Sequence, residues 1–296
     1  MHLNNIHYEE KKATHLRRIW QTFIDNPLAL VGLWAIACLI LLTLLTPFIA
    51  PFSPEAQNSQ AILMPPSWHE HGSVEYFFGT DDLGRDIFSR ILHGVQLTFG
   101  MSLVIVFAAL FIGFIIGAIS GMMTGLKSSI LGHLFDALLS IPSLLMAILV
   151  VAVIGPGLTN VFWAVGIAMV PQFIRAIHQA VHEELQKDYV TAAKLDGANS
   201  LQIFWYVIMP NVWDILIIQV TMAISAAILD IAALGFLKLG AQAPSPEWGA
   251  MMAQGLDNLL LAPWTITIPG VAILITVLSI NLVGDGLRSA LVPKRN

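Results

Sequence analysis

The sequence is poor in charge: Asp, Glu, Lys and Arg make up only 11% of its 296 residues. Soluble domains carry about 25% charged residues, so this chain has too few to cover a water-soluble fold. Its single cysteine, Cys38, lies in an apolar run and excludes both a disulfide framework and a cysteine metal cage. A formal net charge of −5 offers no overall basic surface for nucleic acid.

Hydrophobic residues, in contrast, make up 56% of the chain, and its mean hydropathy is +0.76. The first hydrophobic run, residues 28–50, follows a polar arm of residues 1–27. A membrane-spanning helix needs about 20 apolar residues, whereas the core of a signal peptide has about 7–15. We therefore expect an uncleaved first helix. The pattern predicts an all-α, polytopic membrane protein with six spans, the other five at residues 95–124, 130–154, 160–181, 212–237 and 266–287.

The basic residues predict how these helices are oriented. Six spans put both termini on one side of the membrane, and eleven of the 14 Lys and Arg residues fall on that side. The other three are Arg85, Arg90 and Lys238. Basic residues are enriched in cytoplasmic segments. We therefore expect both termini and residues 182–211 in the cytoplasm, and residues 51–94 and 238–265 outside.

Four glycines in the second predicted helix are spaced four residues apart, so they lie along one stripe of its surface. Such stripes are typical of membrane helices that pack closely, because glycine has no side chain to hold a neighbour away. The alternative is a chance arrangement in a span that contains glycine. We predict a helix-packing role for Gly113, Gly117, Gly121 and Gly125.

The segment Gly79–Arg90, GTDDLGRDIFSR, resembles a phosphate-binding loop only superficially. Such a loop ends in Lys followed by Ser or Thr, but Arg85 and Asp86 occupy those positions. Asp81 and Asp82 would also repel phosphate. We therefore predict no nucleotide site here and no ATP hydrolysis by this chain alone.

The histidines do not form a convincing metal site. His178 and His182 are four residues apart on a predicted helix, but the neighbouring acids follow the pair instead of lying between its members. We expect polar side chains at a helix end and no bound metal. The pair His69 and His71 in the external segment receives the same interpretation.

Four acidic residues lie in or near the ends of spans, at Asp136, Asp214, Asp230 and Asp285. An ionisable group inside a membrane is costly and marks a candidate functional site. Asp230 is the deepest, about 27 Å along the fifth helix at about 1.5 Å per residue. It is our candidate for lining a solute path. Helix packing or an ion pair with Lys238 is the alternative interpretation.

The segment 183–211 predicts a helix, a sharp turn and a second helix. Residues 185–195 suit a helix, and Gly197 suits the left-handed position that ends one. Asn199 and Gln202 have the spacing of an N-cap pair. Such a compact element at the inner membrane surface suits docking of a partner. The alternative is an amphipathic connector.

This segment resembles the cytoplasmic signature of importer-type ABC-transporter permeases, which reads E-A-A, three residues, Gly, nine residues, then I-x-L-P. Ala192, Ala193, Gly197 and Pro210 match it, while Thr191 replaces the Glu. In that family the segment is the coupling helix, which sits in a cleft of the ATPase subunit. The resemblance implies a coupling role for Asp188, Tyr189, Ala192, Ala193, Asp196, Gly197 and Pro210.

Further motifs resemble the peptide and nickel subfamily of these permeases, in its C-type. They are Gly79–Arg90, Asp136 with Ser140-Ile141-Pro142, Leu234–Met252 and Asn281–Arg288, within a resemblance that covers residues 20–293. The external motif residues are Gly79, Thr80, Asp81, Gly84, Arg85 and Asp86. Gln96 departs from the pattern, because many relatives have Arg there. Ile228–Met252 is most similar to a Sap-type branch, which is associated with antimicrobial-peptide resistance, peptide uptake and, in some bacteria, putrescine export.

The resemblance implies a type I ABC-importer transmembrane fold, MetI-like, in the bacterial inner membrane. It divides the chain into a cytoplasmic arm (1–27), a first helix with a periplasmic segment (28–94), a permease domain (95–290) and a cytoplasmic tail (291–296). The permease domain includes the coupling segment 183–211.

The implied function is half of a translocation path, for peptides including antimicrobial ones, or alternatively for export of putrescine and other polyamines. The implied partners are a second homologous permease, two ATPase subunits that bind ATP and Mg, membrane lipid and an optional periplasmic binding protein. No cofactor is expected in this chain. An intramembrane enzyme would need paired catalytic groups within a span, and a self-contained secondary transporter would show inverted repeats. The sequence has neither.

Overall fold

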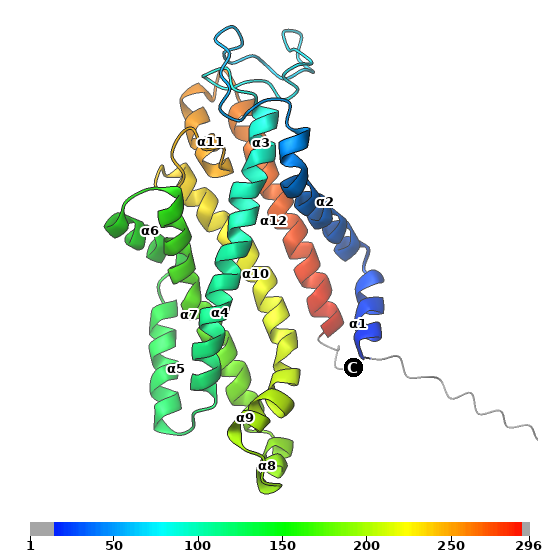
Figure 1. The fold of residues 1–296 in the computed structure, drawn as a ribbon, viewed down its shortest axis with the longest axis vertical. Coiled ribbons are helices and arrows are strands. Elements are labelled where there is room, and N and C mark those ends of the chain that lie inside the picture. Colours follow the sequence, from blue (N-terminus) through cyan, green and yellow to red (C-terminus); the bar gives the residue numbers. More distant parts are fainter. Residues whose placement is uncertain (1–14, 292–296) are drawn as a thin grey trace, which may run out of the picture.

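The computed structural model describes residues 15–291, a bundle of long helices with looped segments gathered at one end (Figure 1). Residues 15–291 contain no β-strand. Five helices are long and apolar enough to cross a membrane, and a bent pair brings the number to six if it forms one span. This arrangement confirms the prediction of an all-α, polytopic membrane protein.

Five of the six predicted runs correspond to long helices, and hydrophobicity explains their positions. The helix of the second run begins at Ile87 rather than at residue 95, because the amphipathic α3 extends the apolar run into the external segment. The five are α2 (Pro27–Ile49), then α3 (Ile87–Val95) with the π-helix η1 (Gln96–Gly100) and α4 (Met101–Gly121), then α7 (Leu158–Leu185), α10 (Met209–Phe236) and α12 (Trp264–Leu291).

The third predicted run is not one straight helix. It consists of α5 (Leu126–Leu139) and α6 (Ser143–Ile154), which are bent by 79° at the break between them. Proline lacks a backbone N–H, and its ring disfavours helical geometry at the residue before it. Pro142 therefore explains why the helix stops and restarts here, which hydrophobicity over residues 130–154 did not reveal.

The N-terminal arm contains a helix that the sequence analysis did not predict, α1 (His15–Ile24). Its Phe23 is buried and lies beside Gly286 of α12. The side chain of Asn26 then caps α2, accepting from the N–H groups of Leu28 and Ala29. The rest of the arm and the tail beyond residue 291 lie outside the described residues, with the basic residues Lys11, Lys12, Lys294 and Arg295.

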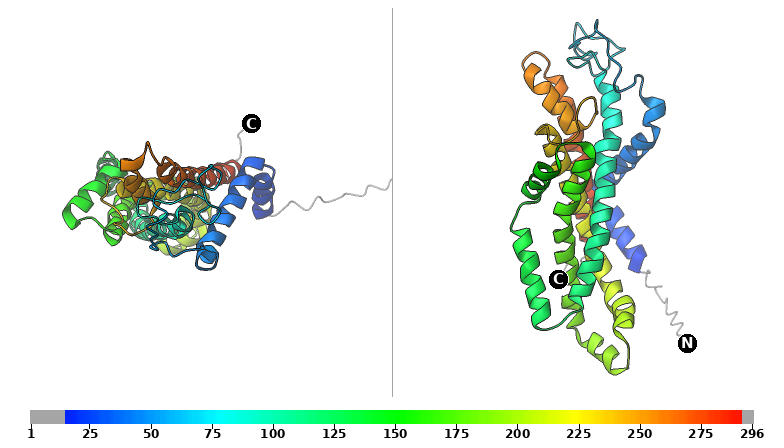
Figure 2. Two further views of the ribbon diagram at one scale, coloured as in Figure 1. Left: turned by 90° about the horizontal axis from the view of Figure 1, so that it is seen from above. Right: turned by 60° about the vertical axis from the view of Figure 1, so that its left-hand side comes forward.

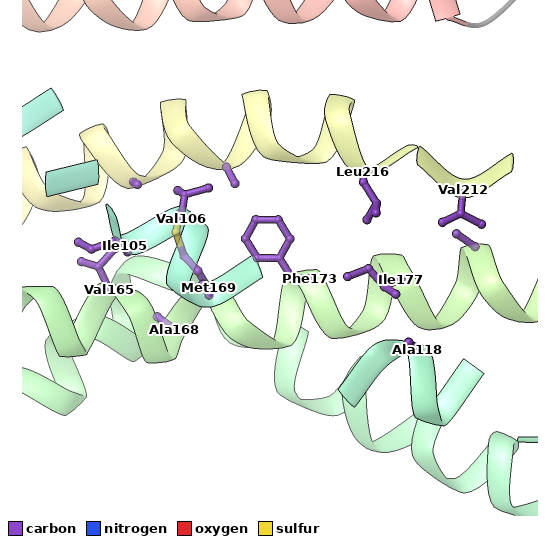
Figure 3. Packing of buried hydrophobic residues seen from close by; sticks show 14 of the residues in the cluster. Ile105, Val106, Ala118, Val165, Ala168, Met169, Phe173, Ile177, Val212 and Leu216 are labelled. Atoms are coloured by element: carbon purple, nitrogen blue, oxygen red, sulfur yellow. The ribbon is translucent and has the colours of Figure 1, made fainter. Parts of the chain in front are cut away.

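The main core lies where α4, α7 and α10 pack together. Figure 3 shows Phe173 and Ile177 of α7 pointing toward Leu216 of α10, and all three are buried. Side chains of α4, such as Ile105, close the same cluster. The core therefore ties together helices that are far apart in the sequence.

The two ends of the bundle differ. The long segment between α2 and α3 lies at one end together with α11 (Trp248–Gly255), whereas α8 (Asp188–Leu195) and α9 (Ser200–Gln202) project at the other (Figures 1 and 2). The start of α2 and the end of α12 point toward the α8 end. The described parts of both terminal regions thus lie toward the same side, as an even number of spans requires.

Candidate functional site

A tight helical turn projects from the bundle between α7 and α10. The N–H of Ala198 donates to the carbonyl of Ala193 (3.1 Å), and the N–H of Gly197 donates to that of Lys194 (3.1 Å). These two bonds are the Schellman arrangement that ends a helix, and it requires a left-handed residue. Gly197 supplies it with φ +88°. The predicted helix end at Gly197 is confirmed.

The next helix begins with a reciprocal cap. Asn199 Oδ1 accepts from the N–H of Gln202 (2.8 Å), and Gln202 Oε1 accepts from the N–H of Asn199 (2.9 Å). This capping box satisfies two backbone donors that a helix start would otherwise leave free. The predicted N-cap pair is confirmed, and the turn has little freedom to change its direction.

Most side chains in this element are exposed, and Val190 is the buried exception. Val190 is fully buried, and Tyr189 Oη accepts from Asn211 Nδ2 of α10 at 3.3 Å. Leu195 and Leu201, on opposite sides of the turn, are 84% and 71% exposed. Exposed leucines beside a rigid turn form an apolar tip that a partner protein can cover.

Six of the seven residues predicted to act in coupling lie together on this element. Asp188, Tyr189, Ala192, Asp196 and Gly197 are exposed, and Ala193 is half-buried.

Pro210 was predicted to lie just before the next span, but in the structure it lies inside the helix that forms this span. The helix runs without interruption from Ser200 to Phe236, and Pro210 lies inside it. It is preceded by the π-helix η2 (Ile203–Ile208). A proline lacks the N–H for the usual helical bond and its ring crowds the carbonyl four residues earlier, so a wider turn there relieves the clash.

Three of the four predicted stripe glycines face α7. A Cβ on Gly117 would lie 2.8 Å from the carbonyl oxygen of Ile174, and one on Gly121 would lie 2.8 Å from Cβ of Val181. A Cβ on Gly113 would collide with Cβ of Phe173. The spaces beside these three glycines are too small for any side chain, so the backbones of α4 and α7 lie in close contact.

The fourth glycine, Gly125, does not belong to this stripe. Helix α4 ends at Gly121, and Gly125 lies in the turn before α5 with φ +72° and no atom near its Cβ position. The spacing of four residues therefore continues beyond the end of α4, where it no longer places residues on one face of a helix.

The external motif forms a buried ionic cluster. Arg85 Nε lies 2.7 Å from Asp81 Oδ2, and Arg90 Nε lies 3.7 Å from the same oxygen. Both guanidinium groups also donate to Gln254 Oε1 of α11. The cluster joins the loop after α2 to α11, and it leaves the two arginines paired inside the protein.

The other motif residues shape the loop around this cluster. Gly79 and Gly84 have φ of +79° and +69°, and Thr80 Oγ1 donates to the carbonyl of Ala61. Asp86 caps α3 by accepting from the N–H of Ser89 (2.8 Å). Burial raises the pKa of Asp86 above its ordinary value. These residues hold the external segment in one conformation.

Glu247 anchors α11, a role that the sequence analysis missed. Its carboxylate accepts from the N–H groups of Gly249 (2.9 Å) and Ala250 (2.8 Å) and from Thr98 Oγ1 (3.2 Å) in η1. Burial raises the pKa of Glu247. Acidic residues are enriched in the first turn of helices, but Glu is not among the common N-cap residues, so the sequence carried only a weak signal for this role.

Asp230, the sequence candidate for a solute path, is buried in α10 at 8% exposure. Its Oδ2 has no hydrogen-bond partner among the described residues. The alternative pairing with Lys238 does not occur among the ion pairs within residues 15–291. The structure thus shows a buried Asp230 carboxyl group, and a role in lining a solute path stays a prediction.

The histidine pair sits in a polar cavity of about 340 Å³ between α5 and α7. The rings of His178 and His182 stack at 5.8 Å, and Arg175 Nε lies 2.7 Å from Asp136 Oδ1. Within residues 15–291, no three His, Cys, Asp or Glu residues are placed to hold a metal ion.

Comparison with known proteins explains this arrangement. The family described as "Binding-protein-dependent transport system inner membrane component" matches residues 109–296. The "N-terminal TM domain of oligopeptide transport permease C" matches residues 14–66.

Similar proteins carry consistent names. The peptide transport system permease protein SapC of Escherichia coli is 47% identical over 292 residues, which is 99% of either chain. The di/tripeptide transport system permease protein DppC of Pseudomonas aeruginosa is 43% identical, over 94% of this chain and 92% of that one.

Among solved structures, the MetNI methionine ABC transporter in an inward-facing conformation aligns with a TM-score of 0.54 at 18% identity. The alignment covers 69% of this chain and 97% of that one, so it supports a MetI-like fold.

The apolar helices and these relatives make the chain a multi-pass inner-membrane protein. ATP hydrolysis in such systems belongs to separate subunits. The chain belongs to the binding-protein-dependent transport system inner membrane components, within the dipeptide and oligopeptide C-type permeases of ABC transporters.

Proposed function

We propose that this chain is one of two membrane subunits of a bacterial peptide transporter and forms half of its translocation path. The observation that carries the proposal is its similarity along the whole chain to permeases named for peptides, di/tripeptides and dipeptides. The alignments with those permeases cover 94% or more of this chain.

The rigid turn formed by α8, Gly197 and α9 supports a coupling role. Its two helix ends are fixed by backbone bonds and by the Asn199–Gln202 capping box, so a force on the tip is transmitted to α10. We infer that it docks on an ATPase subunit, with ATP and Mg bound by that subunit. The tip then faces the cytoplasm, as do both termini.

The partners follow from this assignment. They are a second homologous permease, two ATPase subunits and a periplasmic substrate-binding protein. ATP binding would rock the helices between two states, exposing the path to each side in turn.

Reconstitution of the co-purified complex in proteoliposomes tests the proposal. We expect ATP-dependent movement of a radiolabelled tripeptide and no movement of radiolabelled putrescine. Movement of putrescine alone would instead favour polyamine export. An antimicrobial peptide added as competitor should slow tripeptide transport if such peptides share the path.

A further inference from the structure

Helix α12 carries an exposed polar stripe along its last three turns. Asn281, Asp285 and Arg288 are spaced at four and three residues, so they lie on one face, and all three are exposed. Asn281 lies about 15 Å from the described end of the helix at about 1.5 Å per residue. Ionisable groups in a membrane helix face a bundle interior or a water-filled cavity rather than lipid.

These three side chains line one cavity of about 240 Å³ between α12 and α10. The wall on α10 consists of Ile218, Thr221 and Met222. The two helices approach closely where Gly284 faces Thr221, since a Cβ on Gly284 would lie 2.8 Å from Thr221 Oγ1. The cavity is therefore a built groove with polar groups on one wall.

The charged groups of this groove are available to a ligand. Neither Asp285 nor Arg288 takes part in an ion pair within the described residues, although they are one helical turn apart. The buried Ser225 donates to Asn281 Oδ1 (2.8 Å), which fixes the orientation of that amide. The groove thus offers one negative and one positive group in succession along the helix.

An apolar trough adjoins the groove on the other side of α10. This cavity of about 560 Å³ lies between α4 and α10 and shares Thr221 with the polar groove. Aromatic side chains dominate its walls: Phe107, Phe111, Phe114, Trp205 and Trp213. A molecule in contact with both cavities would place charged groups against α12 and apolar groups against α4.

We propose that the groove between α10 and α12 binds the charged termini of a short peptide during its passage. Asp285 faces the terminal ammonium group, and Arg288 faces the terminal carboxylate, for which its planar guanidinium is suited. The adjoining trough takes apolar side chains. This inference rests on the proposed peptide function and assigns it a recognition site. A polyamine, which has no carboxylate, would leave Arg288 without a partner.

Protection of a cysteine in the groove tests the site directly. The parent carries Met222→Cys together with Cys38→Ser, because Cys38 is exposed. It is assembled with its partner permease and ATPases, solubilised in detergent without a binding protein, and labelled with a water-soluble maleimide. Trialanine at about ten times its Kd should slow labelling about tenfold. N-acetyl-trialanine and trialanine amide should each protect much less.

Charge-removing variants assign each terminus. Asp285→Asn in the parent should raise the Kd for trialanine about tenfold, because a charge-assisted bond is lost. In this variant, trialanine should protect no better than N-acetyl-trialanine. The Kd for N-acetyl-trialanine itself should be the same in the variant as in the parent. Arg288→Gln should behave in the same way with trialanine amide. Asp25→Asn, which removes the same charge from an exposed position before α2, is the matched control.

Several outcomes would overturn the site. They are equal protection by all three peptides, no protection by trialanine in the parent, or a cysteine already inaccessible because a partner helix fills the groove. These results come from the parent alone, so a failure of Asp285→Asn to assemble leaves the test intact. ATP-driven trialanine uptake by the wild-type complex is measured separately. If uptake occurs without protection, this site is wrong while the peptide function stands.

Discussion

At the scale of single residues, the carboxylate of Glu247 connects α11 to the membrane helix that contains η1. Its removal would leave two backbone N–H groups and the Thr98 hydroxyl without their acceptor in a buried place. We expect Glu247→Ala to lower the free energy of unfolding by about 2 kcal/mol. Thermal unfolding of the detergent-solubilised protein, followed by tryptophan fluorescence, measures it. Glu75→Ala, at an exposed position of the external segment, should have almost no effect.

The same carboxyl group predicts a pH dependence. Burial raises its pKa above the ordinary value of 4.5. Between 4.5 and the raised pKa, the folded protein keeps a proton that the unfolded chain has released, so stability falls as the pH rises through this window. Glu247→Gln cannot titrate. Unfolding measured from acidic to neutral pH should therefore show wild type losing stability relative to Glu247→Gln, and a constant difference would contradict this.

At the scale of elements, the contact between α4 and α7 depends on glycine. Gly117→Leu would place a branched side chain where even a Cβ lies 2.8 Å from a carbonyl oxygen. We expect poor assembly of the complex, judged by the yield of the co-purified subunits, and near-normal transport by what does assemble. Gly166→Leu on α7 is the control, because no atom lies within 4 Å of its Cβ position. Equal yields for both variants would show that the stripe is not a packing surface.

The elements also show what the sequence could and could not predict. Hydrophobicity was sufficient for the long helices, and local capping chemistry was sufficient for Gly197 and for Asn199–Gln202, since both depend on neighbouring residues. The break at Pro142 and the π-helix before Pro210 depend on local backbone geometry, which the hydrophobicity of a whole segment does not reveal. The long-range partner of Glu247, Thr98, lies 149 positions earlier in the chain, so only the fold reveals it.

Candidate path residues show the same limit. Depth in a span drew attention to Asp230, but depth does not say which face of a helix a residue occupies. The structure buries Asp230 and exposes Asp285 in a groove, although Asp285 lies closer to a helix end, while the path role of Asp230 stays a prediction. Helix orientation about its own axis is set by packing among α4, α7, α10 and α12.

At the scale of the whole molecule, the orientation in the membrane is open to a direct test. In a Cys38→Ser background, we expect Ser73→Cys to react with an impermeant maleimide added to intact cells and Ser200→Cys to react only after permeabilisation. The reason is the excess of Lys and Arg on the side of the α8 turn. The opposite pattern would invert the proposed topology.

In the proposed function, this subunit couples ATP hydrolysis to peptide movement through the turn at Gly197. Its φ of +88° suits glycine, tolerates asparagine, and strains a β-branched residue by about 1–2 kcal/mol or more. About 1.4 kcal/mol changes a docking equilibrium tenfold, whereas the packed membrane helices should withstand it.

The most direct measurement is ATP hydrolysis and tripeptide transport in the same proteoliposomes, for wild type, Gly197→Val and Gly197→Asn. We expect Gly197→Val to insert and assemble, to keep hydrolysing ATP and to lose most of its transport, while Gly197→Asn transports like wild type. Ala192→Arg should resemble Gly197→Val, because it adds bulk and charge to the docking surface. Normal transport by both Gly197→Val and Ala192→Arg would show that the turn is only a connector and would contradict the account.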